Sequence, residues 1–249
     1  MLPDMFTLKE KTAVVTGAGN PLALAIGEAF AEAGANIVAV SHRAEAAQSL
    51  AEKAQKLGRN AIAVTADTAR SADVRRVVDE AERRFGKVDI LLAGEEMAMA
   101  GPISELSEDQ WDTMMSVNAK SVFLCSKLFG QKMVERGSGR IIALAHALGV
   151  AGVPNTSAYS ASKGAVVQLV RSLGLEWAAT GVTVNAIAPG WFKGSWEEPE
   201  VDPVERFIPV RRRGEPEELG PLAVYLASDG AGFVTTSIYV IDGAQLCHA

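Results

Sequence analysis

A tyrosine and a lysine four positions apart form the chemical pair that points most directly to a reaction. Tyr159 and Lys163 lie in SAYSASKGAV, within a segment predicted to be helical, 157–180. Residues at positions i and i+4 of a helix share a face. A free phenol titrates near pH 10 and is a poor base at neutral pH, but a neighbouring ammonium favours the phenolate. The pair could therefore supply a general acid or base.

A turn containing two glycines is the second pattern that could do chemistry. It reads Thr16-Gly17-Ala18-Gly19-Asn20, follows the apolar run TAVVTG, and is followed by Pro21 and Leu22. The N-terminus of a helix attracts phosphate groups, and proline suits its first turn. We interpret the turn as a binding site for the phosphates of a dinucleotide. The alternative is a structural strand–helix turn that holds no nucleotide.

The elements that must position these groups alternate along the chain. Compact apolar runs predict strands, and amphipathic segments closed by glycine predict helices. Ser107 and Gln110 fit a capping box. Strands are predicted at 12–17, 35–41, 61–67, 88–94, 139–145, 182–188 and 237–243, and helices at 21–34, 44–58, 71–85, 108–136, 157–180 and from Pro216.

This alternation, with short connections, predicts one α/β domain over 1–249. The expected architecture is a Rossmann-like, doubly wound parallel sheet of about seven strands with helices on both faces. Ligands of such sheets bind at the carboxyl ends of the strands. The glycine turn lies at such an end.

Composition excludes several classes of protein. A formal net charge of -6 argues against a nucleic-acid partner. The sequence has no apolar run of the roughly 20 residues that a membrane helix needs, and its first residues lack a signal pattern. Cys125 and Cys247 are too few for a disulfide scaffold and lack metal-ligand spacing. We therefore expect no metal, no membrane partner and a cytoplasmic location.

Taken together, the motifs resemble those of the short-chain dehydrogenase/reductase family. The turn resembles the family's T-G-x-x-x-G-x-G, the segment around Tyr159 its Y-x-x-x-K helix, and VNAIAPGWF its P-G segment. The resemblance runs from about residue 7 to 245. It implies an oxidoreductase that transfers a hydride between a nicotinamide dinucleotide and a small carbonyl or alcohol. It also implies a homodimer or homotetramer formed through the segments 108–136 and 157–180.

The resemblance also implies roles for individual residues. Tyr159 is expected to be the acid/base, Lys163 to lower its pKa and hold the nicotinamide ribose, and Asn118 to hold a relay water. Asp67 matches an acidic residue near the adenine. The full set of expected cofactor contacts is Gly17, Gly19, Asn20, Leu22, Ser41, His42, Arg43, Asp67, Thr68, Ala93, Gly94, Tyr159, Lys163, Pro189 and Gly190.

The most consequential departure from the family pattern is at the catalytic serine. That serine lies thirteen positions before the tyrosine, where this chain has His146. A neutral imidazole can donate one N–H, so His146 could polarise a substrate oxygen in place of the serine. The alternative is that the serine's role has lapsed and His146 only fills space.

Two further departures affect the dinucleotide site. Pro21 and Ala23 replace the second and third glycines of the turn. Glu95 and Glu96 fall where an ungapped alignment has the last two residues of Asn-Asn-Ala-Gly; a shifted alignment could instead end the motif at Ala93-Gly94, and both asparagines are absent in either case. Two acidic residues after a strand usually form a solvated turn. At the carboxyl end of a strand they could instead bind ribose hydroxyls, although they would repel a pyrophosphate.

Specificity is expected to depend on two other segments. The second strand ends in Ser41, His42 and Arg43 and lacks the acidic residue that takes the ribose 2′-hydroxyl of NAD, so we expect NADP(H) to be preferred over NAD(H). The segment 190–215, with Trp191 and Trp196, lacks periodicity. We interpret it as a substrate loop, with a surface excursion as the alternative.

Two other functions stay open on the sequence alone. The departures at Pro21, His146 and the asparagine motif also suit a non-catalytic relative that binds a ligand or partner. A third hypothesis is a lyase resembling halohydrin dehalogenases, which abandon the nucleotide. The active sites of those enzymes contain Ser, Tyr and Arg, so Lys163 and His146 argue against this hypothesis.

Overall fold

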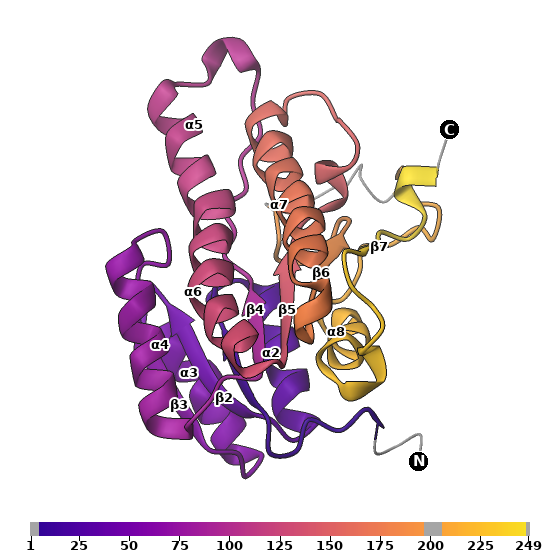
Figure 1. Cartoon of the computed structure of the whole chain (residues 1–249). Helices are drawn as coiled ribbons and strands as arrows, with labels where there is room; N and C mark the ends of the chain where they lie inside the picture. Colours follow the sequence, from indigo (N-terminus) through magenta and orange to yellow (C-terminus); the bar gives the residue numbers. More distant parts are fainter. Residues whose placement is uncertain (1–4, 197–205, 248–249) are drawn as a thin grey trace.

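The central feature is a single sheet of seven parallel strands, in a computed structural model that describes residues 5–196 and 206–247 (Figure 1). The strand order is β3-β2-β1-β4-β5-β6-β7, so the order reverses between β1 and β4. This confirms the predicted doubly wound architecture. The strands are β1 (Thr12–Val15), β2 (Asn36–Ser41), β3 (Ala61–Thr65), β4 (Ile90–Ala93), β5 (Gly139–Leu144), β6 (Val182–Pro189) and β7 (Ile238–Ile241).

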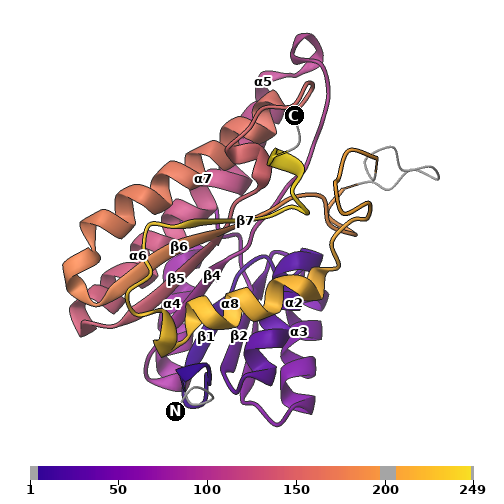
Figure 2. The ribbon, with the colours of Figure 1, turned by 90° about the vertical axis from the view of Figure 1, so that its right-hand side faces the viewer.

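Helices cover both faces of the sheet, as Figure 2 shows. On one face lie α2 (Pro21–Glu32), α3 (Ala44–Lys56) and α8 (Gly220–Ala227), and on the other lie α4 (Ser71–Phe85), α6 (Ser121–Arg136) and α7 (Ser157–Glu176). Side chains of a strand alternate between the two faces. In β1, Val14 packs in the core on the α6 side, while Ala13 and Val15 pack in the core on the α2 side.

The predicted helix 108–136 contains a π-helical turn. It begins at α5 (Glu108–Met115), where Ser107 Oγ accepts from the Gln110 amide at 3.2 Å and Gln110 Oε1 accepts from the Ser107 amide at 2.9 Å. The predicted capping box is therefore confirmed. Residues Ser116–Lys120 are π-helical, and α6 follows directly. A π turn adds a residue to the helix and is frequent at functional sites. Here it carries Asn118.

Other predicted boundaries shift by small amounts. The predicted helix 157–180 ends as α7 at Glu176 and continues in a separate 3₁₀ turn, Ala178–Thr180. The helix expected from Pro216 begins as a 3₁₀ turn, Pro216–Leu219, before α8. Of the predicted loop 190–215, residues 197–205 lie outside the described residues, and Phe192 bridges to Gly214.

Two findings concern membranes and metals. Within 5–196 and 206–247, none of the helices is both long and apolar enough to cross a membrane. The same residues contain no group of three or more His, Cys, Asp or Glu side chains that could hold a metal ion.

Candidate functional site

Tyr159 and Lys163 lie side by side on α7, at the carboxyl end of β5. Lys163 Nζ is 5.7 Å from the centre of the Tyr159 ring and donates to the backbone oxygen of Leu144, the last residue of β5, at 3.1 Å. Both side chains are fully buried. The helical spacing therefore brings the acid/base candidate and its ammonium to one point at the ligand-binding edge of the sheet.

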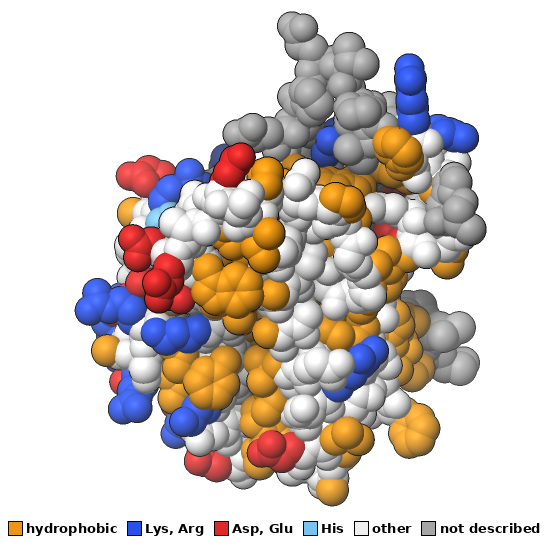
Figure 3. Space-filling view, turned by 90° about the horizontal axis from the view of Figure 1, so that it is seen from above, with side chains coloured by type: hydrophobic (Ala, Val, Ile, Leu, Met, Phe, Trp, Pro, Cys, Tyr) orange, Lys and Arg blue, Asp and Glu red, His pale blue; other side chains and the backbone are white. Residues whose placement is uncertain are grey.

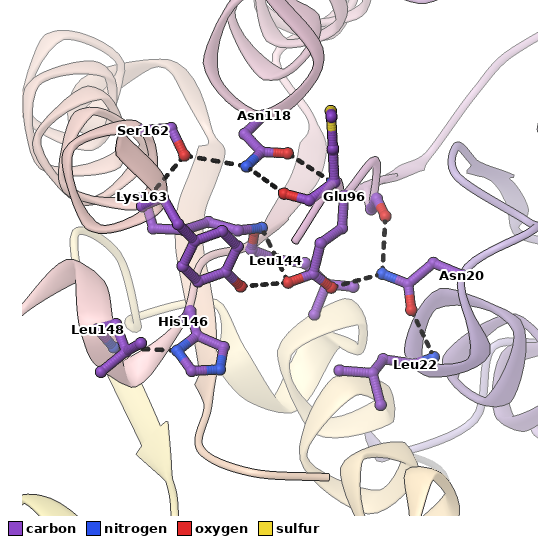
Figure 4. A network of polar contacts seen from close by, with 12 residues as sticks. Asn20, Leu22, Glu96, Asn118, Leu144, His146, Leu148, Ser162 and Lys163 are labelled. Carbon is purple, nitrogen blue, oxygen red and sulfur yellow. Dashed lines mark hydrogen bonds and ion pairs between the residues drawn. The ribbon is translucent and has the colours of Figure 1, made fainter. Parts of the chain in front are cut away.

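Asn118 lies in the π-helical turn and faces the same point. Its Oδ1 accepts from the Met97 amide at 2.7 Å, and its Nδ2 donates to Met97 O and to Ser162 Oγ, both at 2.9 Å. The side chain thus ties the segment after β4 to α7. In this arrangement Asn118 fixes the backbone of Met97, and its hydrogen bonds in Figure 4 go to Met97 and Ser162 and not to Lys163.

Glu96 occupies the centre of the site, as Figure 4 shows. The Tyr159 hydroxyl donates to Glu96 Oε1, which is also 3.7 Å from Lys163 Nζ. Asn20 Nδ2 donates to Glu96 Oε2 at 2.8 Å. The Glu96 side chain is only 7% exposed. One carboxylate therefore engages a phenol and an ammonium from α7 and the amide of Asn20, the N-cap of α2.

The charges of this cluster depend on one another. Burial alone would raise the pKa of Glu96, but the Lys163 ammonium and the hydrogen bonds from Tyr159 and Asn20 outweigh it, so this pKa is below its usual value. Burial lowers the pKa of Lys163, and Glu96 opposes that shift. Burial and the Glu96 carboxylate raise the pKa of Tyr159 well above 10. With Glu96 in place, Tyr159 is therefore a protonated donor.

Glu95 lies on the other side of the glycine turn. Its Oε1 accepts from the Gly17 amide at 3.0 Å. Burial raises its pKa, while hydrogen bonds from Thr68 and Gly17 oppose the shift. The interpretation of Glu95 and Glu96 as a solvated turn is therefore wrong. Both carboxylates point inward, because donors at the edge of the sheet satisfy them.

His146 lies two residues after the end of β5 and presents one unpaired donor. Its Nδ1 accepts from the Leu148 amide at 3.0 Å, which leaves the proton of a neutral ring on Nε2. Burial lowers the pKa of His146 to about 4. Nε2 is buried and makes no hydrogen bond of good geometry in the described part of the chain, although an interaction with the Gly190 backbone opposes the fall in the pKa of His146. The imidazole is therefore neutral at physiological pH, with an N–H available to a ligand.

Aromatic rings enclose this N–H and the Tyr159 hydroxyl. The His146 ring lies 5.3 Å from Tyr159 and 5.9 Å from Trp191, and the Trp196 ring lies 4.9 Å from Tyr159. Trp191 and Trp196 belong to the predicted substrate loop. Trp196 Nε1 is also buried without a hydrogen-bond partner among the described residues. The loop thus contributes apolar surface and a second unused donor next to the reactive groups.

The predicted dinucleotide site is open beside Asp67 and is occupied by the Glu96 side chain beside Tyr159 and Lys163. A cavity of about 490 Å³ lies beside the glycine turn and is lined by His42, Asp67, Thr68, Glu95 and Glu96, among others. This volume is in the range of small-molecule sites, and the cavity is the end at which Asp67 is expected to face adenine. At the opposite end, the Glu96 carboxylate holds Tyr159 and Lys163. The residues therefore fit a dinucleotide once the Glu96 side chain has turned away.

The predicted cofactor residues at the end of β2 and the start of α2 contact one another. Arg43 Nη2 donates to Gly19 O at 3.2 Å, and Ser41 Oγ accepts from the Arg43 amide at 3.2 Å. The Leu22 amide donates to Asn20 Oδ1 at 2.9 Å, so Asn20 caps α2. These contacts fix the end of β2 against the start of α2.

Three glycines near the site are required by close packing. A Cβ at Gly17 would lie 2.3 Å from Gly94 O, and one at Gly94 would lie 2.7 Å from Ala23 Cβ. Ala93 is the last residue of β4 and is buried. Pro189 ends β6, and a Cβ on Gly190 would lie 2.6 Å from Asp242 Cβ. Backbone segments of neighbouring strands therefore approach closely along the edge where the ligand is expected.

The sequence placed Tyr159, Lys163 and His146 at one edge but missed the central role of Glu96. The signal for Glu96 was its place three residues after β4, at the carboxyl edge of the sheet. That it reaches Tyr159 depends on how far α7 stands above the sheet, which spacing does not reveal. Ser162 was missed for the same reason, although it lies beside Lys163 on α7.

Comparison with known proteins gives matches along the whole chain. A family model described as enoyl-(acyl carrier protein) reductase matches residues 17–244. D-threitol dehydrogenase from Mycolicibacterium smegmatis is 35% identical, over 96% of this chain and 94% of that protein. A 2-dehydro-3-deoxy-D-gluconate 5-dehydrogenase from Bacillus subtilis is also 35% identical, over 98% of each chain.

Solved structures agree with these relatives. A protein from Beutenbergia cavernae, described as an NAD(P)-dependent gluconate 5-dehydrogenase with NADP bound at low occupancy, matches with a TM-score of 0.91 and 35% identity, covering 98% of this chain and 99% of that one. A short-chain type dehydrogenase/reductase from Mycobacterium marinum gives a TM-score of 0.92 at 29% identity, covering 99% and 100%. The chain therefore belongs to the short-chain dehydrogenase/reductase family and is an oxidoreductase that transfers a hydride between a nicotinamide dinucleotide and an alcohol or carbonyl group.

Proposed function

We propose that this oxidoreductase acts on a secondary alcohol of a small polyhydroxy compound, or on the matching ketone, with NADP(H) and with Tyr159 as the acid/base. The observation that carries the proposal is the meeting of Tyr159, Lys163 and the unpaired Nε2–H of His146 at the carboxyl end of β5. The substrate class rests on the relatives, which are named for threitol and for a gluconate derivative.

Each group has a separate task in this proposal. The Tyr159 hydroxyl gives its proton to the carbonyl oxygen of the substrate during reduction and takes it back during oxidation. The His146 Nε2–H donates to the same oxygen, as a preorganised donor for developing negative charge. Lys163 holds positive charge beside Tyr159 and favours the phenolate. The nicotinamide, when bound, supplies or accepts the hydride.

Asn118 acts in this proposal through the backbone that it fixes. Its two hydrogen bonds to Met97 hold the segment after β4, and its bond to Ser162 holds the helix that carries Tyr159 and Lys163. Asn118 is therefore a positioning residue. Its amide keeps the two walls of the site at a fixed separation.

Replacing Tyr159 by Phe tests the proposed acid/base. Turnover of a polyol panel, such as threitol and gluconate, should be lost, while NADPH still binds at least as tightly as to the wild type, because the phenolic proton acts in the transition state. Replacing Lys163 by Ala should damage both affinity and turnover. Steady-state rates and NADPH fluorescence titrations provide the two readouts. If Tyr159→Phe is as fast as the wild type on any substrate that the wild type oxidises, the assignment fails.

Arg43 and His42 support the proposed preference for NADP(H). Arg43 lies at the glycine turn through its contact with Gly19 O, and His42 lines the cavity. NADPH should bind more tightly than NADH. Arg43→Ala should reduce the difference by about 1.5–3 kcal/mol, the typical value of a charged hydrogen bond. Equal dissociation constants for the two cofactors in the wild type would contradict the preference.

We also propose that the protein works in the cytoplasm as a homodimer or homotetramer. A groove of about 650 Å³ lies between α5, α6 and α7 and is lined by Met115, Ala119, Phe123, Ala165 and Leu169, together with Asp112, Ser116 and Lys120. Phe123 is 45% exposed. Figure 3 shows further hydrophobic side chains exposed in patches among the charged ones. An apolar face of this kind suits burial against a second copy.

A further inference from the structure

One acidic side chain engages two of the polar groups that the proposed reaction would need at the nicotinamide end of the site, Tyr159 and Lys163. The Glu96 carboxylate accepts from the Tyr159 hydroxyl and the Asn20 amide and lies 3.7 Å from Lys163 Nζ. The phenol and the ammonium are the two groups that the proposed function assigns to proton transfer and to holding the ribose. The Tyr159 hydroxyl cannot donate to a ligand while it donates to Glu96, and the same carboxylate lies against the Lys163 ammonium.

The arrangement is stable because a buried ammonium needs a partner. Lys163 is fully buried, and besides the Leu144 carbonyl its neighbour in the network is the Glu96 carboxylate. Removing one member of a buried ion pair leaves the other uncompensated. A ligand that displaces Glu96 must therefore offer oxygen atoms to Lys163 in its place. The hydroxyl groups of a ribose can do this.

We propose that Glu96 is an internal competitor of the dinucleotide: its carboxylate occupies the place of the nicotinamide ribose hydroxyls, and the cofactor binds only by displacing it. The inference rests on the proposed function, because that function makes Tyr159 and Lys163 the groups that face the ribose and the substrate. Glu96 thereby limits the affinity for the whole dinucleotide, whereas a ligand that binds only at the adenosine end need not displace it.

The structure provides a route for the displaced side chain. Glu96 already lines the cavity of about 490 Å³ that also borders Asp67 and Thr68. The next residue, Met97, makes two hydrogen bonds with Asn118: its amide donates to Asn118 Oδ1, and its carbonyl oxygen accepts from Asn118 Nδ2. The backbone therefore stays in place, and rotation of the Glu96 side chain alone releases Tyr159 and Lys163.

Displacement also changes the chemistry of Tyr159. The Glu96 carboxylate keeps the phenol protonated, and its departure removes a negative charge from the hydroxyl while Lys163 remains. Tyr159 then becomes a better base. Entry of the cofactor and activation of the acid/base are thus a single event.

Dissociation constants of a whole cofactor and of a fragment test the competition. The probes are NADPH and 2′,5′-ADP, which carries the adenosine end alone, titrated by calorimetry into the full chain and into Glu96→Gly and Glu96→Gln. Glu96→Gly should bind NADPH at least ~10-fold more tightly than the wild type, because displacement no longer breaks hydrogen bonds to a charged group. The NADPH affinity of Glu96→Gln should lie between those of the wild type and Glu96→Gly. The affinity for 2′,5′-ADP should change by less than ~2-fold in both variants.

A matched control separates occupancy from simple charge repulsion. Glu95→Gln removes the same charge one residue earlier, where the carboxylate contacts Gly17 and not Tyr159. It should alter the affinities for NADPH and 2′,5′-ADP to a similar extent. Equal tightening of NADPH by Glu95→Gln and Glu96→Gln would overturn the competition, as would unchanged NADPH affinity in both Glu96 variants. Glu96→Gln keeps the test valid if Glu96→Gly does not fold.

The outcomes also separate this inference from the proposed function. Wild-type protein that binds NADPH and oxidises a polyol, with Glu96 variants that bind it no better, overturns the competition alone. Failure of the wild type and of both Glu96 variants to bind NADPH overturns both. Binding by Glu96→Gly but not by the wild type supports the competition in its strongest form.

Discussion

His146 should have two measurable effects, one on kcat and one on the pH dependence of stability. Its Nε2–H is buried and unpaired beside the Tyr159 ring. One preorganised donor to a developing negative charge typically contributes 10²–10³ in rate. His146→Ala should therefore lower kcat by about that factor, and His146→Ser should restore much of the loss, because a hydroxyl can donate from the same strand end. Steady-state kinetics of the three proteins measure this. Equal kcat values for the wild type and His146→Ala would remove His146 from the mechanism.

The same three proteins should differ in the pH dependence of their stability. The pKa of His146 is about 4 in the folded chain and about 6.5 when unfolded. Between these values the unfolded chain binds a proton that the folded chain refuses, so stability falls as the pH drops from 6.5 to 4. The free energy of unfolding of the wild type should fall by about 3 kcal/mol more than that of His146→Ser over this window. Urea unfolding at pH 7 and pH 4 checks the difference, and parallel pH curves would contradict it.

Helical spacing in the sequence pairs some of the site residues but not Glu96. Tyr159 and Lys163 could be paired in advance, because helical spacing fixes which side chains share a face. Glu96 could not, because its contact with Tyr159 joins two elements that are 63 positions apart. The carboxylate lies inward only because Asn20, Tyr159 and Lys163 converge on it. A pair of acidic residues after a strand otherwise indicates a solvated turn.

Among the elements, the turn from β1 to α2 depends on Gly17. Its φ is +68°, and a Cβ would lie 2.3 Å from the Gly94 carbonyl oxygen. Gly58 has a similar φ of +75° but open space around it, so it isolates the cost of the left-handed backbone alone. Gly58→Ala should destabilise the protein by about 1–2 kcal/mol. Gly17→Ala should cost a further ~1–3 kcal/mol for the overlap. Chemical denaturation of both variants measures the difference, and equal losses would show that the turn relaxes freely.

The ends of helices could be predicted from the sequence where the residues that determine them are neighbours in the chain. The capping box at Ser107 and the predicted helix 71–85 were both placed correctly, because caps and amphipathic periodicity are written in neighbouring residues. The π-helical turn at Ser116–Lys120 was not predicted. It lies inside a continuous helical pattern, and its extra residue is stabilised by the contacts of Asn118 with Met97 and Ser162, which belong to other elements.

For the whole molecule, the proposed assembly through α5, α6 and α7 can be tested by placing one charged side chain in the groove between these helices. Phe123 lines the groove between these helices and is 45% exposed, and Leu57, at the end of α3, is 43% exposed away from that groove. Phe123→Glu should shift the protein to a smaller species in light scattering, because a buried charge opposes association. Leu57→Glu should leave the assembly unchanged. A wild type that is monomeric at all concentrations would contradict the assembly.

The buried pair of Lys163 and Glu96 also bears on how long the protein lasts in a cell. Without Glu96, a ligand-free chain would hold an uncompensated ammonium in its interior, and losing one member of a buried pair typically costs 3–5 kcal/mol. That is a large part of the stability of a folded domain, and proteases degrade the unfolded fraction. Because Glu96 supplies the counter-charge to Lys163, the folded chain does not need a bound cofactor to compensate its buried ammonium. Removal of the nucleotide should therefore stop turnover while the free energy of unfolding keeps the contribution of this pair.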